Sequence, residues 1–144
     1  MAEVKIDVYY DGACPFCLAS MQRTARMDAD SRIHFIDLNQ PEAVDAAAGR
    51  FTAKDLIDEM HAHLPDGTWR VGYYAWAAIV GQLPGLRGLS KLLLFAPIAG
   101  VGRRLYRWFA NHRYLASKLL GMPMPCSSSA VCKVPPARPN RTSA

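Results

Sequence analysis

Short apolar runs and helix-forming stretches follow one another along the first eighty residues. Residues 4–10 are β-branched and aromatic with partial alternation, which predicts a strand. Residues 18–27 are rich in helix formers, and residues 32–38 predict a second strand. The elements expected further along are a short helix over 41–48, a capped turn at 52–55, strands over 57–64 and 68–71 joined by a hairpin turn at 65–67, and a helix over 73–82.

These elements follow the order β-α-β-α-β-β-α. That order predicts an α/β fold built on one mixed sheet flanked by helices. The thioredoxin fold has the same order of elements, so residues 1–88 are expected to form a thioredoxin-like core.

The region after this core is helical in character and basic. A Pro/Gly linker at 83–88 precedes helix-forming residues 89–120, with breaks expected at Pro97 and at 100–102. Beyond the breaks, apolar residues recur at helical spacing on one face and arginines fall elsewhere. The apolar residues are Val101, Leu105, Trp108 and Phe109, and the arginines are Arg103, Arg104 and Arg107. We expect a basic helical extension over 89–120 packed on the same domain, then a flexible Pro/Ser-rich tail over 121–144.

Composition and charge narrow the class of protein. With 144 residues, 51% of them hydrophobic and 20% charged, the chain suits one compact globular domain. All 12 acidic residues lie at or before Asp66, so residues 1–66 carry a net charge of −6 and the remainder carries +11. The basic half favours contact with an acidic protein or a membrane surface, although a solvated basic surface is the simpler interpretation. We expect no nucleic-acid partner.

The chain has neither an apolar signal-peptide core near its start nor a stretch of the ~20 apolar residues that spans a bilayer. We therefore expect a cytoplasmic protein. In a reducing cytoplasm, cysteines are more often catalytic or metal-binding than structural. The chain has four of them, at Cys14, Cys17, Cys126 and Cys132.

Cys14 and Cys17 carry the strongest chemical signal. Two residues separate them, and the pair follows a predicted strand at the start of a predicted helix, where free N–H groups and the helix dipole favour a thiolate. Thiol–disulfide exchange needs such a thiolate and a second thiol close enough to resolve the mixed disulfide. We assign Cys14 as the nucleophile and Cys17 as the resolving cysteine. Pro15 suits the first turn of the helix and stiffens the site.

Other interpretations of the cysteines stay open. The pair could be half of a zinc site, but Cys126 and Cys132 have five intervening residues, wider than the usual zinc knuckle. These two tail cysteines could instead form a disulfide, relay electrons or have no role. Asp11 precedes Cys14 by three residues and either forms the turn or accepts a proton from a thiol. No nucleotide-binding loop or haem-attachment motif is present, so we expect no cofactor and no metal.

The stretch from Tyr9 to Cys17, YYDGACPFC, resembles the signature of the DCC family of predicted thiol–disulfide oxidoreductases. That family is named for an Asp-x-x-Cys-x-x-Cys motif, which Asp11, Cys14 and Cys17 match. Weaker similarity covers residues 60–75 and 106–114. The resemblance implies a thioredoxin-like domain and a disulfide oxidoreductase activity.

Relatives of the thioredoxin and glutaredoxin type carry a cis-proline before the third strand, but residues 56–60 here contain no proline. The Gly-Gly and acidic pair that helps glutaredoxins hold glutathione is also replaced, by residues 72–75. The sequence therefore does not favour glutathione as a dedicated cosubstrate.

The sequence predicts an enzyme that reduces or exchanges disulfides through its Cys-Pro-Phe-Cys centre. Its substrate would be a protein or small-molecule thiol or disulfide, and its reductant is not identified. The alternative is a redox-sensing or zinc-binding interaction module that docks through its basic helical segment.

Overall fold

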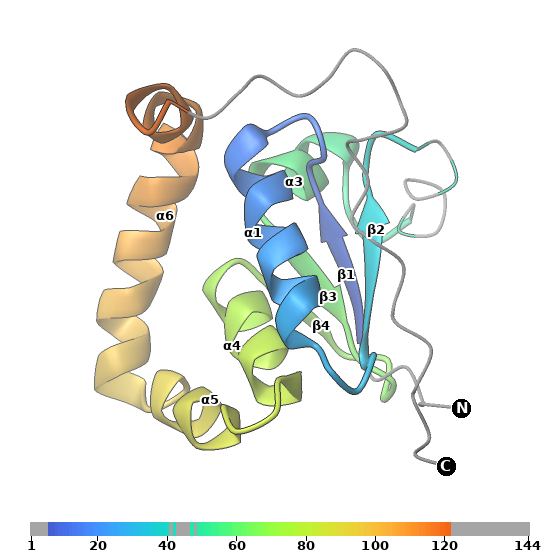
Figure 1. The fold of residues 1–144 in the computed structure, drawn as a ribbon, viewed down its shortest axis with the longest axis vertical. Helices are drawn as coiled ribbons and strands as arrows, with labels where there is room; N and C mark the ends of the chain where they lie inside the picture. The colour runs from blue at the N-terminus through green and yellow to red at the C-terminus, as the bar shows by residue number, and fades with distance from the viewer. Residues whose placement is uncertain (1–5, 41, 43–46, 48, 122–144) are drawn as a thin grey trace.

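The computed structural model describes residues 6–40, 42, 47 and 49–121 and is built on a four-stranded sheet (Figure 1). The strands are β1 (Ile6–Tyr10), β2 (Ile33–Asp37), β3 (His61–His63) and β4 (Trp69–Val71). Their order across the sheet is β2-β1-β3-β4, with β2 parallel to β1, and β3 and β4 each antiparallel to its neighbour. The predicted α/β fold with a mixed, thioredoxin-like sheet is confirmed.

Helices flank this sheet, as predicted. Among the described residues they are α1 (Pro15–Met27), α3 (Ala53–Asp58), α4 (Tyr73–Gln82), α5 (Arg87–Leu93) and α6 (Ala96–Leu119). The helix expected over 41–48 lies largely outside the described residues, as does the tail from 122 onward. Within the described part of the chain, no helix is long and apolar enough to cross a membrane.

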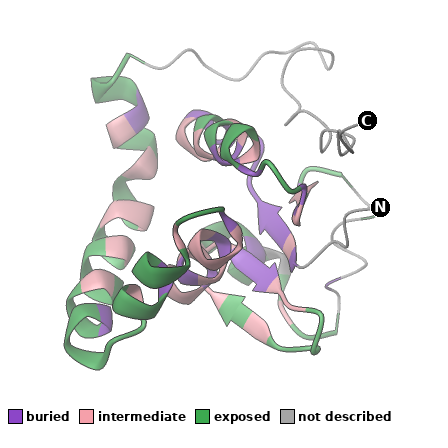
Figure 2. Cartoon of the chain, turned by 60° about the horizontal axis from the view of Figure 1, so that its bottom comes forward, coloured by how far each residue is buried: buried purple, intermediate pink, exposed green. Residues whose placement is uncertain are grey.

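The central strand β1 is buried on both faces, as Figure 2 shows by its purple colour. Side chains alternate along a strand, so Val8 faces one layer and Tyr9 the other. The first layer packs β1 against α1 and α4, through residues that include Met21 and Ile79. The second layer joins Tyr9 to Leu56 of α3. This burial on both faces holds the carboxyl end of β1 rigidly, and the cysteine loop starts there.

The strand predicted over 57–64 is wrong at its start. Thr52 and Asp55 form a capping box, in which each side chain accepts a hydrogen bond from the other residue's backbone N–H. This cap starts helix α3, which continues through Asp58. Only His61–His63 then pair as β3.

The helical breaks expected at 100–102 are also absent. Helix α6 runs without interruption from Ala96 to Leu119, with Pro97 in its first turn, where a missing N–H costs nothing. Gly102 is required by packing, because a Cβ at this position would overlap the ring of Tyr73. The glycine therefore allows the helix to approach α4 closely.

Most of the apolar residues that the sequence places on one face of α6 lie on the outside of the molecule. Val101, Leu105 and Trp108 are 61%, 64% and 63% exposed, and only Phe109 of the predicted apolar set packs inward, against Phe16. The helix instead contacts the core through residues at the spacing 102, 106, 109, 113 and 117. Amphipathic and small side chains, including Tyr106 and Ser117, form the inner face.

Candidate active site

Cys14 and Cys17 lie at the junction between β1 and α1. The strand ends at Tyr10, a turn follows, and Cys14 is the N-cap residue of α1. The backbone N–H of Cys17 donates to Cys14 Sγ at 3.3 Å, which satisfies one of the free N–H groups of the first turn. Pro15 is buried at the start of the helix, where sequence analysis expected it. The two cysteines are therefore held within one helical turn of each other.

Carboxylates fix the loop that precedes Cys14. Asp37, at the end of β2, accepts a hydrogen bond from the backbone N–H of Gly12 at 3.1 Å. A Cβ on Gly12 would overlap this carboxylate, so the close approach requires glycine. Asp11 accepts from the backbone N–H of Ala13 at 2.9 Å and from Asn39 at 3.3 Å. Asp11 thus forms the turn, one of the two roles considered for it.

The two thiols ionise very differently. A hydrogen bond from the Cys17 side chain lowers the pKa of Cys14 from 9.0 to about 7. The backbone N–H of Cys17 and the charge of Arg113 act in the same direction, whereas burial and the charge of Asp11 oppose them. The pKa of Cys17 is raised, because it donates its proton to Cys14 and is itself buried. Above about pH 7 the pair therefore holds one negative charge, on Cys14, and one proton, on Cys17.

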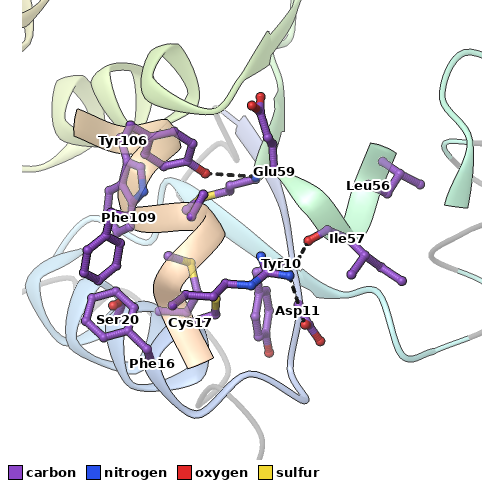
Figure 3. A pocket seen from close by; sticks show the side chains of 15 residues that line it. Tyr10, Asp11, Phe16, Cys17, Ser20, Leu56, Ile57, Glu59, Tyr106 and Phe109 are labelled. Atoms are coloured by element: carbon purple, nitrogen blue, oxygen red, sulfur yellow. Dashed lines mark hydrogen bonds and ion pairs between the residues drawn. The ribbon is translucent and has the colours of Figure 1, made fainter. Parts of the chain in front are cut away.

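Access to the pair is also unequal. Cys14 has 0% of its surface exposed, while Cys17 is half-buried and lines a pocket of about 50 Å³ (Figure 3). The rest of the pocket wall is mainly apolar and comes from α1, α3, α4 and α6. Its lining includes Phe16, Met21, Leu56, Ile57, Met60, Trp76, Tyr106, Phe109 and Arg113.

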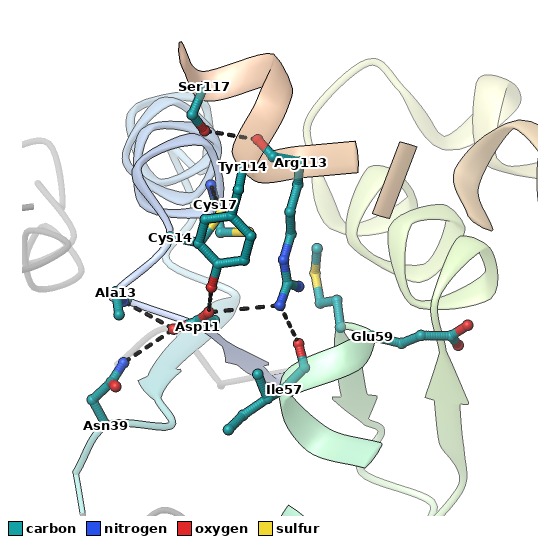
Figure 4. Close-up of polar contacts among 12 residues, drawn as sticks. Asp11, Ala13, Cys14, Cys17, Asn39, Ile57, Glu59, Arg113, Tyr114 and Ser117 are labelled. Atoms are coloured by element: carbon teal, nitrogen blue, oxygen red, sulfur yellow. Dashed lines mark hydrogen bonds and ion pairs between the residues drawn. The ribbon is translucent and has the colours of Figure 1, made fainter. Parts of the chain in front are cut away.

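Two residues of α6 that sequence reasoning did not assign reach the cysteine loop (Figure 4). Arg113 donates to the carbonyl of Ile57 at 2.7 Å, lies 3.7 Å from the Asp11 carboxylate and has a side chain only 12% exposed. The hydroxyl of Tyr114 donates to Asp11 at 2.9 Å. Both lie in the stretch 106–114 that resembles the DCC family, but that similarity implied no role for them. No local pattern connects residues 103 positions apart in the chain.

The backbone before β3 is bound by α6 as well. In addition to the bond at Ile57, the N–H of Met60 donates to the hydroxyl of Tyr106 at 3.2 Å. Both backbone groups belong to residues 56–60, the segment that contains no proline where thioredoxins carry a cis-proline. Side chains of α6 therefore form hydrogen bonds with backbone groups on the wall of the site.

The histidines of β3, His61 and His63, are not among the residues that line the pocket beside Cys17. His61 is buried, donates from Nδ1 to the carbonyl of Glu59 at 2.8 Å, and has its pKa lowered by burial. Among the residues that the structure describes, no group of three or more His, Cys, Asp or Glu side chains could hold a metal ion. Cys126 and Cys132 lie outside the described residues, so the interpretations that involve them stay predictions.

Comparison with known proteins gives one family. The family model for DCC1-like thiol-disulfide oxidoreductases matches residues 8–119. This match includes the cysteine loop, most of β1, the other three strands of the sheet and all of α6. No curated protein and no solved structure matches the chain significantly.

Proposed function

Because the chain belongs to the DCC1-like thiol–disulfide oxidoreductase family, we propose that it exchanges electrons with thiols and disulfides through Cys14 and Cys17. The observation that carries the proposal is the unequal ionisation of this pair at the start of α1. A nucleophile with a pKa of about 7 is substantially a thiolate near neutral pH, and a protonated neighbour one turn away can resolve the product.

In the proposed reaction, Cys14 is the nucleophile. Its thiolate attacks one sulfur of a substrate disulfide, the substrate S–S bond breaks, and the leaving sulfur takes a proton from solvent. Cys17 then loses its proton and attacks Cys14 Sγ, which releases the second substrate thiol. The substrate gains two electrons, and the enzyme is left with a Cys14–Cys17 disulfide. An external thiol reductant resets the pair, and the reverse sequence oxidises a substrate dithiol.

Arg113, Asp11 and Pro15 support this chemistry without bonding to substrate sulfur. Arg113 lowers the pKa of Cys14 by its positive charge. Asp11 holds the turn and pairs with both Arg113 and Tyr114. Pro15 leaves the first turn of α1 rigid, so that Cys17 returns to Cys14 after each mixed disulfide.

The size of the pocket favours a protein or peptide disulfide as substrate. Pockets that enclose small-molecule ligands usually measure about 300–1,000 Å³. A pocket of about 50 Å³ admits part of one side chain, so most of the substrate would lie outside it. Since Cys14 is covered, the substrate sulfur reaches it only after a neighbouring side chain moves. Tyr114, whose hydroxyl is tied to the loop before Cys14, is the proposed mobile group.

A redox titration tests the proposal. The full chain is equilibrated in buffers of graded redox potential, and its thiols are alkylated and identified by peptide mass. We expect a reversible two-electron transition confined to Cys14 and Cys17. Cys14→Ser abolishes disulfide turnover, while the matched substitutions Cys126→Ser and Cys132→Ser leave it unchanged. Turnover by the Cys14→Ser protein, or alkylation of the pair only after metal chelation, would contradict the proposal.

A further inference from the structure

The outer side of α6 carries an apolar stripe that the fold leaves uncovered among the described residues. Large side chains recur along it at alternating spacings of three and four, interrupted only at His112, so they form one line along the helix. They are between 37% and 79% exposed. The stripe consists of Ile98, Val101, Leu105, Trp108, Leu115 and Leu119.

This stripe belongs to the surface and not to the core. Helix α6 stands at the edge of the molecule in Figure 1, and it contacts the rest of the fold through other positions, 102, 106, 109 and 113. Leu92 and Phe95, at the end of α5 and the N-cap of α6, are 52% and 60% exposed and extend the apolar surface past the start of the helix. An exposed row of large apolar side chains of this kind marks an interaction site.

Positive charge borders the stripe along one flank. Arg104 and Lys118 lie beside it at helical spacing, and Arg103 and Arg107 follow on the next row. All four are exposed. The chain has no acidic residue after Asp66, so no carboxylate of α6 or α5 offsets this charge, although Glu59 lies 4.0 Å from Arg107. The face therefore joins an apolar line to a basic edge, and its partner should be apolar and anionic.

The same charges disfavour pairing with a second copy of the chain. Two α6 helices packed stripe to stripe would bring basic flanks together, with no carboxylate on either helix to oppose them. A lipid surface meets the requirement better. It is broad and flat, it receives a straight helix of 24 residues lying on its side, and anionic headgroups pair with the basic flank. Trp108, near the middle of the helix, is the residue type that prefers the boundary between lipid and water.

We propose that the exposed stripe of α6, with its basic flank, docks the folded protein on an anionic lipid surface. The helix lies parallel to the surface, the apolar side chains enter the boundary between headgroups and acyl chains, and the basic flank contacts the headgroups. The inner face of α6, with Arg113 and Tyr114, stays on the cysteine loop. Docking therefore leaves the redox site intact and places it near the membrane.

Cosedimentation of the reduced full-length protein with vesicles tests this inference. We expect binding at low salt to vesicles of phosphatidylcholine mixed with phosphatidylglycerol, and much weaker binding to phosphatidylcholine alone. Leu105→Ser should weaken binding at least tenfold, since it removes an exposed apolar side chain from the stripe. Met27→Ser, which alters a comparably exposed residue on α1, serves as its control and should leave binding unchanged.

A matched pair of charge variants tests the basic flank. Arg104→Gln combined with Lys118→Gln should weaken binding about 30-fold, because each cation near an anionic surface contributes roughly a factor of five. Arg23→Gln combined with Arg26→Gln removes the same charge from exposed positions on α1 and should have little effect. In addition, vesicles should shift the tryptophan emission of the wild type to the blue, and Trp108→Phe should lose that shift.

Three outcomes would overturn the inference. The first is absence of binding at low salt. The second is equal loss in the α1 and α6 charge variants, which would indicate attraction by net charge alone. The third is a dimer of the wild type, seen by light scattering, that Leu105→Ser dissociates, together with no binding of vesicles by the wild type or the variant. That result would assign the face to a second copy of the chain. The redox titration is independent of these results, since no substitution used here touches the cysteine loop.

Discussion

Replacing Arg113 with methionine removes a positive charge from the wall of the cysteine site while it keeps much of the apolar stem of the side chain. The guanidinium contacts the carbonyl of Ile57 and the carboxylate of Asp11, and its charge lowers the pKa of Cys14. Without it, the charge of Asp11 is no longer offset and raises the pKa of Cys14 more strongly. Both effects have the same sign, so the substitution should make the thiolate less stable.

The magnitude follows from how far the surroundings lower the pKa of Cys14. The Cys14 pKa is lowered from 9.0 to about 7, and the largest contribution is the hydrogen bond from Cys17, which the substitution leaves in place. An opposite charge nearby shifts a pKa by roughly 1–3 units, and partial neutralisation by Asp11 places Arg113 at the low end of that range. We therefore expect the pKa of Cys14 to rise to about 8. One unit corresponds to about 1.4 kcal/mol.

The redox potential should change with this pKa. The thiolate belongs to the reduced form, so a less stable thiolate makes the reduced form less stable and the potential more negative. At about pH 9, where both proteins carry the thiolate, 1.4 kcal/mol corresponds to about 30 mV. At about pH 6, where Cys14 is protonated in both, the potentials should coincide. The difference should therefore grow as the pH rises through the interval from about 7 to about 8.

The assay is the rate of Cys14 alkylation by iodoacetamide against pH, read by peptide mass in a Cys126→Ser/Cys132→Ser background. The midpoint should lie near pH 7 with Arg113 and near pH 8 with methionine. Arg107→Met is the control, because Arg107 lies on the same helix but its side chain is 70% exposed. An unchanged midpoint in a folded Arg113→Met protein would refute the electrostatic role of Arg113.

Substitutions at three further positions, Cys17, Gly12 and Tyr114, test the geometry of the site, with Gly100 as a control position. Cys17→Ala should raise the pKa of Cys14 toward 9, whereas Cys17→Ser keeps a hydroxyl donor and should hold it lower; both variants should accumulate mixed disulfides, visible as adducts by mass. Gly12→Ala should destabilise the fold by about 1–3 kcal/mol in urea denaturation, because its Cβ overlaps the carboxylate at the end of β2. Gly100→Ala, with open space around the new Cβ, should be neutral or stabilising. Tyr114→Ala should raise the plateau rate of Cys14 alkylation at high pH, where the pKa no longer matters; an unchanged plateau would mean that Tyr114 does not limit access.

The order of the elements and the position of the cysteine pair could be predicted from the sequence, because both depend on local signals. Residues 4–10 carried the apolar pattern of a buried strand, and the helix predicted over 73–82 agrees with α4 as observed. The Cys-Pro-Phe-Cys stretch between strand and helix, together with Pro15, placed the pair at a helix N-terminus. The division into 1–88, 89–120 and 121–144 stays a prediction.

The prediction of element boundaries was wrong where the same residues suit two kinds of local structure. Residues 57 and 58 are compatible with a strand, but the capping box at Thr52 and Asp55 extends a helix over them. Gly102 suggested a break in a helix, yet α6 is helical through this position. The glycine is there because a Cβ would overlap the ring of Tyr73. The meaning of a glycine depends on what lies opposite it, and only the packed structure supplies that neighbour.

The electrostatic surroundings of the cysteines were decided by tertiary structure. Arg113 and Tyr114 are about a hundred residues from Cys14, and α6 brings them to Asp11 by packing across α1. Periodicity along one helix cannot say which of two faces will turn inward, and here the apolar stripe turned outward. Motif and order of elements are local properties of the chain, whereas the field around a thiol is a sum over neighbours from every part of it, and those neighbours exist only in the folded protein.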